Sequence, residues 1–357
     1  MIVNIKIIAL MSLFNFALIA QHNSINGKVV DKQTGKPIAN ANIFLAYTFR
    51  GTTTNSQGEY SLKGIPPANY TLVISHIQYN KIQEKVLITP NKVLRLDFKL
   101  EPRVYQLPDV VVNEDEDDWQ DYFDIFKEQL LGMTDNAEQC EILNPYNIDF
   151  YDVDGPGFQA FCKDPIYIKN GALGYRITYI LDYFWTDEFS VKYSGIPYFQ
   201  ELSAPNDSVK QTWIENRAAA YNGSLRDFIA ETADRYTHDS WLEKSLSFSV
   251  ASKPEWIKDA KKFIYTSNLN EAMASGDNEY EIKYCFQSPV IVEYLPHKKV
   301  TNNYEDISKF ELTKDTVTAD ILGRTYDTFG IHILSGKWSK ERLADTLPFE
   351  YSLPEKK

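Results

Sequence analysis

Short segments of alternating hydrophobic and polar residues, separated by turn-forming residues, run through the first hundred positions of the chain. The clearest is residues 93–100, where Leu94, Leu96, Phe98 and Leu100 fall on one face and charges on the other. Glycine, proline and asparagine cluster between such segments, as they do in turns. The pattern predicts a β-sandwich over residues 21–101 with seven strands, at residues 24–31, 42–47, 50–54, 59–62, 70–77, 82–88 and 93–100.

A helical pattern follows over residues 119–131. Trp119, Phe123, Phe126 and Leu130 recur on one face of this helix, which we expect to dock on another element. Before it, residues 102–118 are predicted to form an acidic linker that contains two prolines and five consecutive acids. A calcium site is one interpretation of the acids; a solvated linker next to the positive end of a helix is the other, and it is favoured.

The remaining chain mixes both periodicities. Residues 166–168 and 175–184 predict a hairpin with its turn at Asn170 and Gly171. Two helices are predicted next, one over residues 208–221 and one that begins at a capping box of Ser224 and Asp227, giving a helical insertion of about residues 208–247. Further strands are predicted at residues 263–266, 280–286, 290–295, 316–322 and 329–334, with a loop at 268–278. The fold class is therefore mainly β, with residues 119–357 forming a β-rich α+β domain.

The first twenty residues predict a secretory signal peptide. Lys6 precedes apolar runs at residues 7–13 and 16–20, and Ala20 supplies the small residue required at the cleavage site. These runs are short for a membrane anchor, which is the alternative, and no later stretch is apolar enough to span a bilayer. We therefore expect an exported protein, located in the periplasm or at the cell surface or outer membrane.

The net charge and the number of cysteines restrict the possible binding partners and disulfide bonds. The 357 residues carry a net charge of -12, which disfavours binding to nucleic acid because the phosphate backbone is also negative. Three cysteines allow at most one disulfide bond. Cys140 and Cys162 are close enough in sequence to pair, and buried free thiols are the alternative.

Two sets of motifs resemble known families. Residues 27–31 (GKVVD), 35–42 (GKPIANAN) and 54–60 (TNSQGEY) resemble the carboxypeptidase-regulatory-like domain, whose fold is similar to that of transthyretin. Residues 193–202 (YSGIPYFQEL) and 213–224 (WIENRAAAYNGS) resemble uncharacterised exported proteins of the Bacteroidota envelope, in which such a domain precedes this block. The resemblance implies a transthyretin-like sandwich followed by a C-terminal domain of unknown function.

No catalytic motif is found. None of the five histidines stands in a zinc-ligand pattern, and the chain lacks a nucleophile elbow, a phosphate-binding loop and a dinucleotide-binding loop. We therefore predict no catalytic residue, no metal and no cofactor.

Two clusters are candidates for a ligand or partner surface. Asp182 and Glu188 flank Trp185, an arrangement typical of a sugar-binding platform or of paired carboxylates for glycoside hydrolysis. The alternative, which is favoured, is a strand with one buried face. The second cluster is Trp213, Arg217 and Tyr221, whose spacing on a helix would put a guanidinium between two rings, although internal packing is the favoured interpretation.

The leading functional hypothesis is an exported, non-enzymatic envelope protein that binds or scaffolds another macromolecule. It rests on the absence of catalytic motifs and on 23 Tyr, 20 Phe and 6 Trp, more aromatic residues than a core needs. Carbohydrate binding or processing is the alternative. The expected partner is an envelope protein or a polysaccharide.

Overall fold

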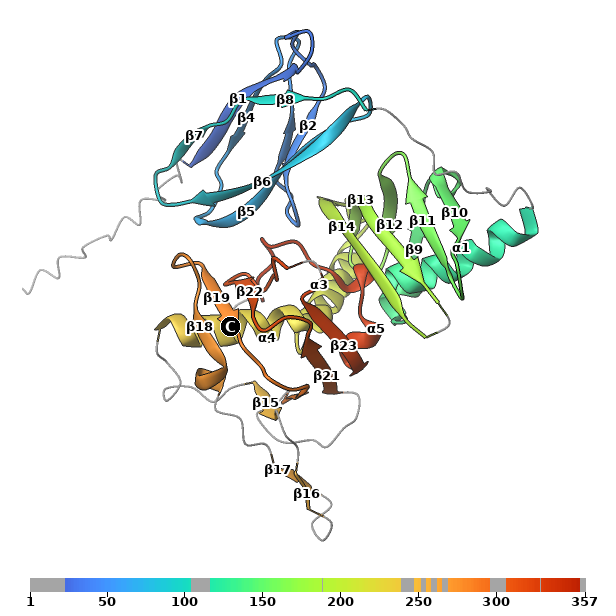
Figure 1. The fold of residues 1–357 in the computed structure, drawn as a ribbon, viewed down its shortest axis with the longest axis vertical. Helices are drawn as coiled ribbons and strands as arrows, with labels where there is room; N and C mark the ends of the chain where they lie inside the picture. Colours follow the sequence, from blue (N-terminus) through green and yellow to red (C-terminus); the bar gives the residue numbers. More distant parts are fainter. Residues whose placement is uncertain are drawn as a thin grey trace, which may run out of the picture.

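The computed structural model describes residues 23–103, 116–187, 189–238, 247–251, 255–257, 262–264, 269–295, 306–327 and 329–353. Three large hydrophobic cores divide this part of the chain into a sandwich module, a central module and a C-terminal module. Figure 1 shows the sandwich module above the other two, with the central sheet beside the C-terminal module. The region that was expected to be one α+β domain thus contains two cores.

The sandwich module consists of two four-stranded sheets. One sheet has the order β4-β1-β7, with β8 also paired to β1, and the other has the order β3-β2-β5-β6. The apolar side chains between them include Ile25, Leu72 and Ile74, all fully buried. The strands are β1 (Ser24–Asp31), β2 (Asn42–Leu45), β3 (Gly51–Thr53), β4 (Glu59–Lys63), β5 (Ala68–His76), β6 (Tyr79–Ile88), β7 (Val93–Arg95) and β8 (Phe98–Leu100).

The module has eight strands where seven were predicted, because the last one is broken at Leu96. The Leu96 carbonyl accepts a hydrogen bond from the Tyr60 hydroxyl at 2.8 Å, and the Leu96 N–H donates to Asn26 at 2.9 Å. A Cβ at Gly27 would lie 1.7 Å from the Leu96 oxygen, so only glycine permits this approach. The alternating pattern identified the strand residues but not the point where the chain shifts along β1.

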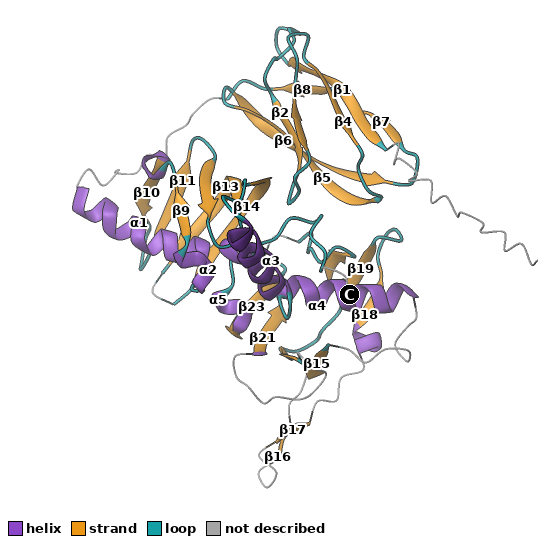
Figure 2. Cartoon of the chain, turned by 180° about the vertical axis from the view of Figure 1, so that it is seen from behind, coloured by secondary structure: helices purple, strands orange, loops and turns teal. Residues whose placement is uncertain are grey.

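The central module is a six-stranded sheet with the order β10-β11-β13-β12-β9 and β14 paired to β13. Helix α1 (Glu116–Leu131) packs on one face through Phe126 and Leu130, as its apolar face predicted (Figures 1 and 2). The predicted hairpin is confirmed as β12 and β13. The other elements are α2 (Asp135–Glu138), β9 (Cys140–Ile142), η1 (Pro145–Asn147), β10 (Ile148–Asp152), β11 (Phe158–Cys162), β12 (Ile166–Asn170), β13 (Tyr175–Thr186) and β14 (Val191–Glu201).

Two sequence expectations change in the central module. Helix α1 begins at Glu116, so the last three acids of the predicted linker belong to the helix, where negative charge suits the N-terminal dipole. Cys140 and Cys162 are both buried free thiols, so the suggested disulfide is not formed. Burial raises the pKa of each thiol to about 12, which keeps both protonated at neutral pH.

The C-terminal module surrounds Phe228 with four further rings, from Phe248, Tyr284, Phe310 and Trp338. Its helices are α4 (Leu225–His238), η2 (Leu269–Ala272) and α5 (Lys337–Lys340), whereas α3 (Asp207–Tyr221) and η4 (Leu343–Asp345) contribute Ala220, Leu343 and Ala344 to the central core. Its strands are β15 (Phe248–Ala251), β16 (Glu255–Ile257), β17 (Lys262–Ile264), β18 (Met273–Ser275), β19 (Glu281–Tyr284), β20 (Val290–Tyr294), β21 (Ile307–Leu312), β22 (Val317–Asp320) and β23 (Ile331–Gly336).

The predicted capping box of the C-terminal module is confirmed. The Asp227 N–H donates to Ser224 Oγ at 3.1 Å, and the Asp227 carboxylate accepts from Gly223 N at 2.9 Å. The predicted loop at 268–278 is wrong over residues 269–275, which form η2 and β18. β15, β16 and β21 were not predicted, and the expected helical extension at 239–246 lies outside the described residues.

The C-terminal segment, residues 341–351, joins all three modules. Leu343, Ala344 and Leu347 belong to the central core, while the Phe349 N–H donates to the Tyr47 carbonyl of the sandwich module at 2.8 Å. In the C-terminal module, the Arg226 guanidinium donates to the carbonyls of four residues of the segment, Leu347, Pro348, Phe349 and Tyr351. The three modules are therefore held together by one short stretch of chain as well as by direct contacts.

No helix in the part of the chain that the structure describes is both long and apolar enough to cross a bilayer. The predicted signal peptide lies outside the described residues.

Candidate functional site at the junction of the modules

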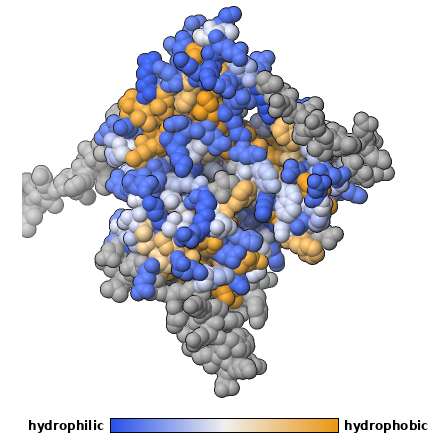
Figure 3. All heavy atoms as spheres, in the orientation of Figure 1, coloured by the Kyte–Doolittle hydropathy of each residue, from blue (hydrophilic) through white to orange (hydrophobic). Residues whose placement is uncertain are grey.

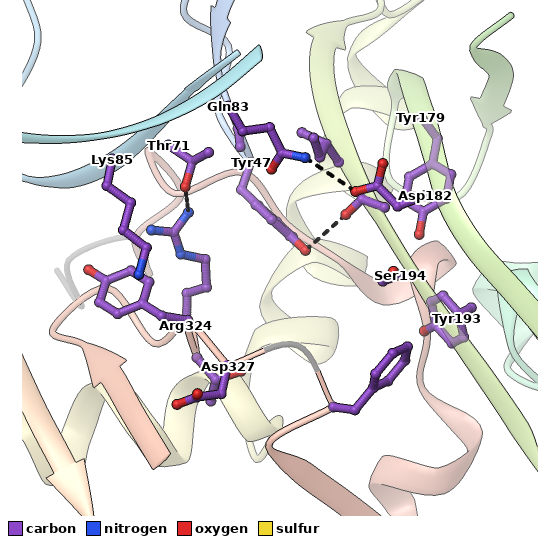
Figure 4. A pocket seen from close by; sticks show the side chains of 16 residues that line it. Tyr47, Thr71, Gln83, Lys85, Tyr179, Asp182, Tyr193, Ser194, Arg324 and Asp327 are labelled. Carbon is purple, nitrogen blue, oxygen red and sulfur yellow. Dashed lines mark hydrogen bonds between the residues drawn. The ribbon is translucent and has the colours of Figure 1, made fainter. Parts of the chain in front are cut away.

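The sandwich module docks on the central sheet through a small apolar cluster. Phe44 of β2, Ala46 of the turn after β2 and Val73 of β5 pack against Ile196 of β14, and all four are buried. Directly beside this cluster, a pocket of about 410 Å³ opens where the two modules meet the segment between β22 and β23. The pocket therefore exists only because three modules are assembled around it (Figure 4).

Tyrosine side chains form much of the pocket wall. Tyr47 comes from the sandwich module, Tyr179 and Tyr193 from the central sheet, and Tyr326 from the segment between β22 and β23. Burial raises the pKa of all four hydroxyls, that of Tyr193 to about 12. At neutral pH these hydroxyls are uncharged, and they offer hydrogen-bond donors and acceptors rather than a base.

Two aromatic residues of the wall have a strained backbone. Tyr47 has φ of 63° and Phe329 has φ of 57°, in the left-handed region that bulky residues rarely adopt. The other two non-glycine residues with positive φ in the described chain, Asn40 and Asn91, are of the type that tolerates it. Strain of this kind persists where a side chain is needed in one position, so both rings mark the pocket as a functional candidate.

Asp182 reaches the pocket because it is the extra residue of a β-bulge. The pairing of β13 with β14 shifts between Leu181 and Tyr183, which leaves Asp182 without a partner in the ladder and redirects its side chain. The carboxylate forms an ion pair with Lys81 and accepts from Gln83 Nε2 at 3.4 Å, both residues of β6. Figure 4 shows Gln83 pointing across the pocket toward Asp182.

Arg324 forms the opposite wall. Its Nε lies 3.3 Å from the fully buried carboxylate of Asp320, and its Nη1 donates to Thr71 Oγ1 at 3.4 Å. The guanidinium is centred 4.7 Å from the Tyr326 ring and 5.4 Å from the Phe349 ring. Nη2 is buried and has no hydrogen-bond partner among the described residues. Nε is also buried and makes no hydrogen bond among the described residues, so the ion pair, the contact with Thr71 and the two rings fix the side chain in position.

The structure places one residue of the predicted cluster of Asp182, Trp185 and Glu188 in the pocket wall. Asp182 lines it, but Trp185 does not, because the Trp185 ring lies against Lys192 Nζ at 5.7 Å near the far end of β13. Glu188 lies outside the described residues. The strand interpretation is supported by Phe184 and Thr186, which are buried and flank Trp185.

The Trp213 cluster serves internal packing. Trp213, Asn216 and Arg217 donate to the carbonyls of Gly171, Ala172 and Leu173 at 2.7–2.9 Å, which fixes α3 on the turn between β12 and β13. The expected sandwich of Arg217 between Trp213 and Tyr221 is wrong.

The guanidinium of Arg217 instead lies 4.2 Å from the Tyr175 ring. The ring of Tyr221 packs against that of Tyr351, with centroids 5.7 Å apart. Helical spacing placed the three residues on one face correctly, but the sheet supplied the ring on which the guanidinium stacks.

Most described aromatic rings pack inside the cores. Phe126, Phe150, Phe158 and Phe184 contact one another in the central core, with ring centroids 4.6–6.0 Å apart. The face seen in Figure 3 is largely hydrophilic, with hydrophobic residues in separate groups. The high aromatic content therefore gives no support for an extended partner-binding surface.

The sequence did not indicate the main pocket residues Tyr47, Gln83, Lys85, Arg324 and Phe329. They come from positions between 46 and 329, and no motif joins them. Within the described ranges, no group of three or more His, Cys, Asp or Glu side chains is placed to hold a metal ion.

The two packed sheets of the sandwich module define it as a β-sandwich domain. Residues 25–112 match the CarboxypepD_reg-like domain family, which confirms the resemblance found in the sequence. No curated protein is detectably similar in sequence to the chain.

Several solved structures resemble parts of the chain. A backbone protein of the group B streptococcus pilus 2b is 17% identical over 22% of this chain and 40% of its own, with a TM-score of 0.19. The 5-hydroxyisourate hydrolase of Klebsiella pneumoniae is 18% identical over 24% of this chain and 94% of its own, with a TM-score of 0.20.

A putative carbohydrate binding protein from Bacteroides uniformis is 14% identical over 45% of this chain and 59% of its own, with a TM-score of 0.20. This chain thus spans less than two thirds of both the pilus protein and the Bacteroides uniformis protein. Similarities this low identify no ligand and no activity.

Proposed function

We propose that this protein is an exported, non-catalytic binding protein of the bacterial envelope, and that it binds a saccharide in the junction pocket. The observation that carries the proposal is the pocket of about 410 Å³ lined by four tyrosines and a set of side chains that both donate and accept hydrogen bonds. Pockets of about 300–1,000 Å³ are typical of small-ligand sites. The exported location rests on the predicted signal peptide.

The chemistry of the wall suits a sugar. Aromatic rings offer apolar faces, while the amide of Gln83, the hydroxyls of Thr71 and Ser194 and the guanidinium of Arg324 are spaced around the pocket. A sugar ring presents the same combination of an apolar face and an edge of hydroxyl groups. The pocket lining contains no histidine or cysteine, and the carboxylate of Asp182 is engaged by Lys81, so the arrangement supports binding rather than bond cleavage.

Isothermal titration calorimetry against neutral and acidic mono- and disaccharides tests the proposal. Ser194 lies on the pocket wall, so Ser194→Phe places a ring in the pocket and is expected to abolish binding. The matched control is Ser61→Phe, the same change at an exposed position of β4. Binding that survives Ser194→Phe, or a complete lack of saccharide binding by a folded protein, would refute the proposed site.

A further inference from the structure

We infer that the saccharide bound in the junction pocket carries a carboxylate group, as a uronic acid does. The inference rests on the proposed function and adds the class of ligand. It comes from a comparison of the charged side chains at the pocket. The acidic side chains are paired with cations of the protein, whereas Lys85 is not paired with a carboxylate of the described residues.

Each acidic side chain in or behind the wall already has a cation. Asp182 is paired with Lys81, and Asp327 lies 2.8 Å from Lys314 Nζ and accepts from the Thr318 N–H at 3.0 Å. Behind the wall, Asp320 is paired with Arg324 at 3.3 Å. None of these carboxylates therefore needs a positively charged ligand.

The cations of the wall are less well compensated. Lys85 Nζ lies 5.1 Å from the centre of the Tyr326 ring and has no carboxylate within 4.0 Å among the described residues. Two carboxylates that interact with it electrostatically, those of Asp277 and Asp327, are each paired with another lysine.

Arg324 and Lys85 also share one aromatic ring. Both cations lie over Tyr326, at 4.7 and 5.1 Å from its centre, and the carboxylates of the pocket lining, Asp182 and Asp327, are each paired with a lysine other than Lys85. Arg324 is already paired with Asp320, so an anion bound beside Tyr326 would add an attraction to Lys85, which has no such partner among the described residues. The guanidinium of Arg324 lies in the pocket wall, and charge-assisted hydrogen bonds to carboxylates are among the strongest that proteins form.

The hydroxyl groups around this positive region extend the match. Tyr47 Oη makes only a long contact of 3.5 Å with the Gly195 carbonyl, and Thr71 Oγ1 accepts from Arg324 without using its own proton there. A ligand with a carboxylate at one end and hydroxyl groups along its ring would meet a cation pair and then a row of neutral donors and acceptors. A bare anion would use only the first part of this surface.

Titration calorimetry with matched sugar pairs tests the inference on the whole protein. Galacturonate is compared with galactose, and glucuronate with glucose, because each pair differs only in the carboxylate. We expect the acid of at least one pair to bind about tenfold more tightly than its neutral twin, and the difference to shrink at high salt. Sodium acetate at the same concentration is the third probe and is expected to bind much more weakly.

Lys85→Met is the informative variant, because Lys85 is exposed and its loss leaves no buried charge, whereas removing Arg324 would strand Asp320. It should remove most of the preference for the acid, and Lys99→Met, at an exposed position of β8, should keep it. Equal binding of acid and neutral sugars would overturn the inference and leave the proposed function intact. Binding of no sugar would refute both, and acetate binding as tight as that of the acid sugar would show that a bare anion is the ligand.

Discussion

The docking of the sandwich module on the central sheet can be tested at Ile196. This side chain is 4% exposed and fills the space between Phe44, Ala46 and Val73 at the module boundary. Truncation to alanine removes roughly three methylene equivalents at about 0.8 kcal/mol each and leaves a cavity, for a total of about 3 kcal/mol. We expect Ile196→Ala to lower the free energy of unfolding by that amount.

The position of the tryptophans makes the experiment selective. The six tryptophans are Trp119, Trp185, Trp213, Trp241, Trp256 and Trp338, all outside the sandwich module. Tryptophan fluorescence therefore reports on the other two modules, whereas far-UV circular dichroism includes the strands of the sandwich. In the native protein the two urea-unfolding curves should coincide, and in Ile196→Ala they should separate because the sandwich is released from the sheet.

Ile125→Ala is the matched control for this experiment. Ile125 is 45% exposed on α1, so the same truncation should cost less than about 1 kcal/mol and leave the two curves together. The docking argument would be refuted if Ile196→Ala were as mild as Ile125→Ala. It would also be refuted if the native curves were already separate, because the modules would then unfold independently.

Two further predictions concern backbone strain and pH. Phe329→Ala should be less stable than Phe329→Gly by about 1 kcal/mol, since alanine keeps the left-handed strain that glycine relieves, and both should weaken saccharide binding; equal stability in urea unfolding would contradict the strain. Burial raises the pKa of Glu341 from 4.5 to about 7, so its contribution to stability is complete below pH 4.5 and is lost as the pH rises through 7. Between pH 5 and 8 the free energy of unfolding of the native protein should fall by about 3 kcal/mol more than that of Glu341→Gln. Parallel curves of unfolding free energy against pH for the two proteins would refute the raised pKa of Glu341.

The local pattern of the chain predicts its elements better than their assembly. Alternation located the sandwich strands, and helical periodicity located the docking face of α1, because both depend on one buried face. The break at Leu96 depends on the missing side chain of Gly27, which lies far away in the sequence. Alternation alone carries no information about such a contact.

The candidate site was predicted only at Asp182. The partners of its carboxylate, Lys81 and Gln83, lie about a hundred positions earlier, and Arg324 of the opposite pocket wall lies more than a hundred later. The bulge that turns Asp182 toward them arises from the register between β13 and β14, which the alternating pattern does not encode. A pocket formed by three modules therefore leaves almost no local signature in the sequence.

The position of residues 341–351 also bears on the order in which the protein can be made. The Phe49 N–H donates to the carboxylate of Glu350, a contact that spans 301 positions, so the link between the first module and the last segment forms only after nearly the whole chain has been synthesised. Contacts so distant along the chain are slow to form. The junction pocket includes side chains from residues 324–329 and lies between modules that this last segment links, so it is completed late, and a chain cut short before residue 324 lacks part of the pocket wall.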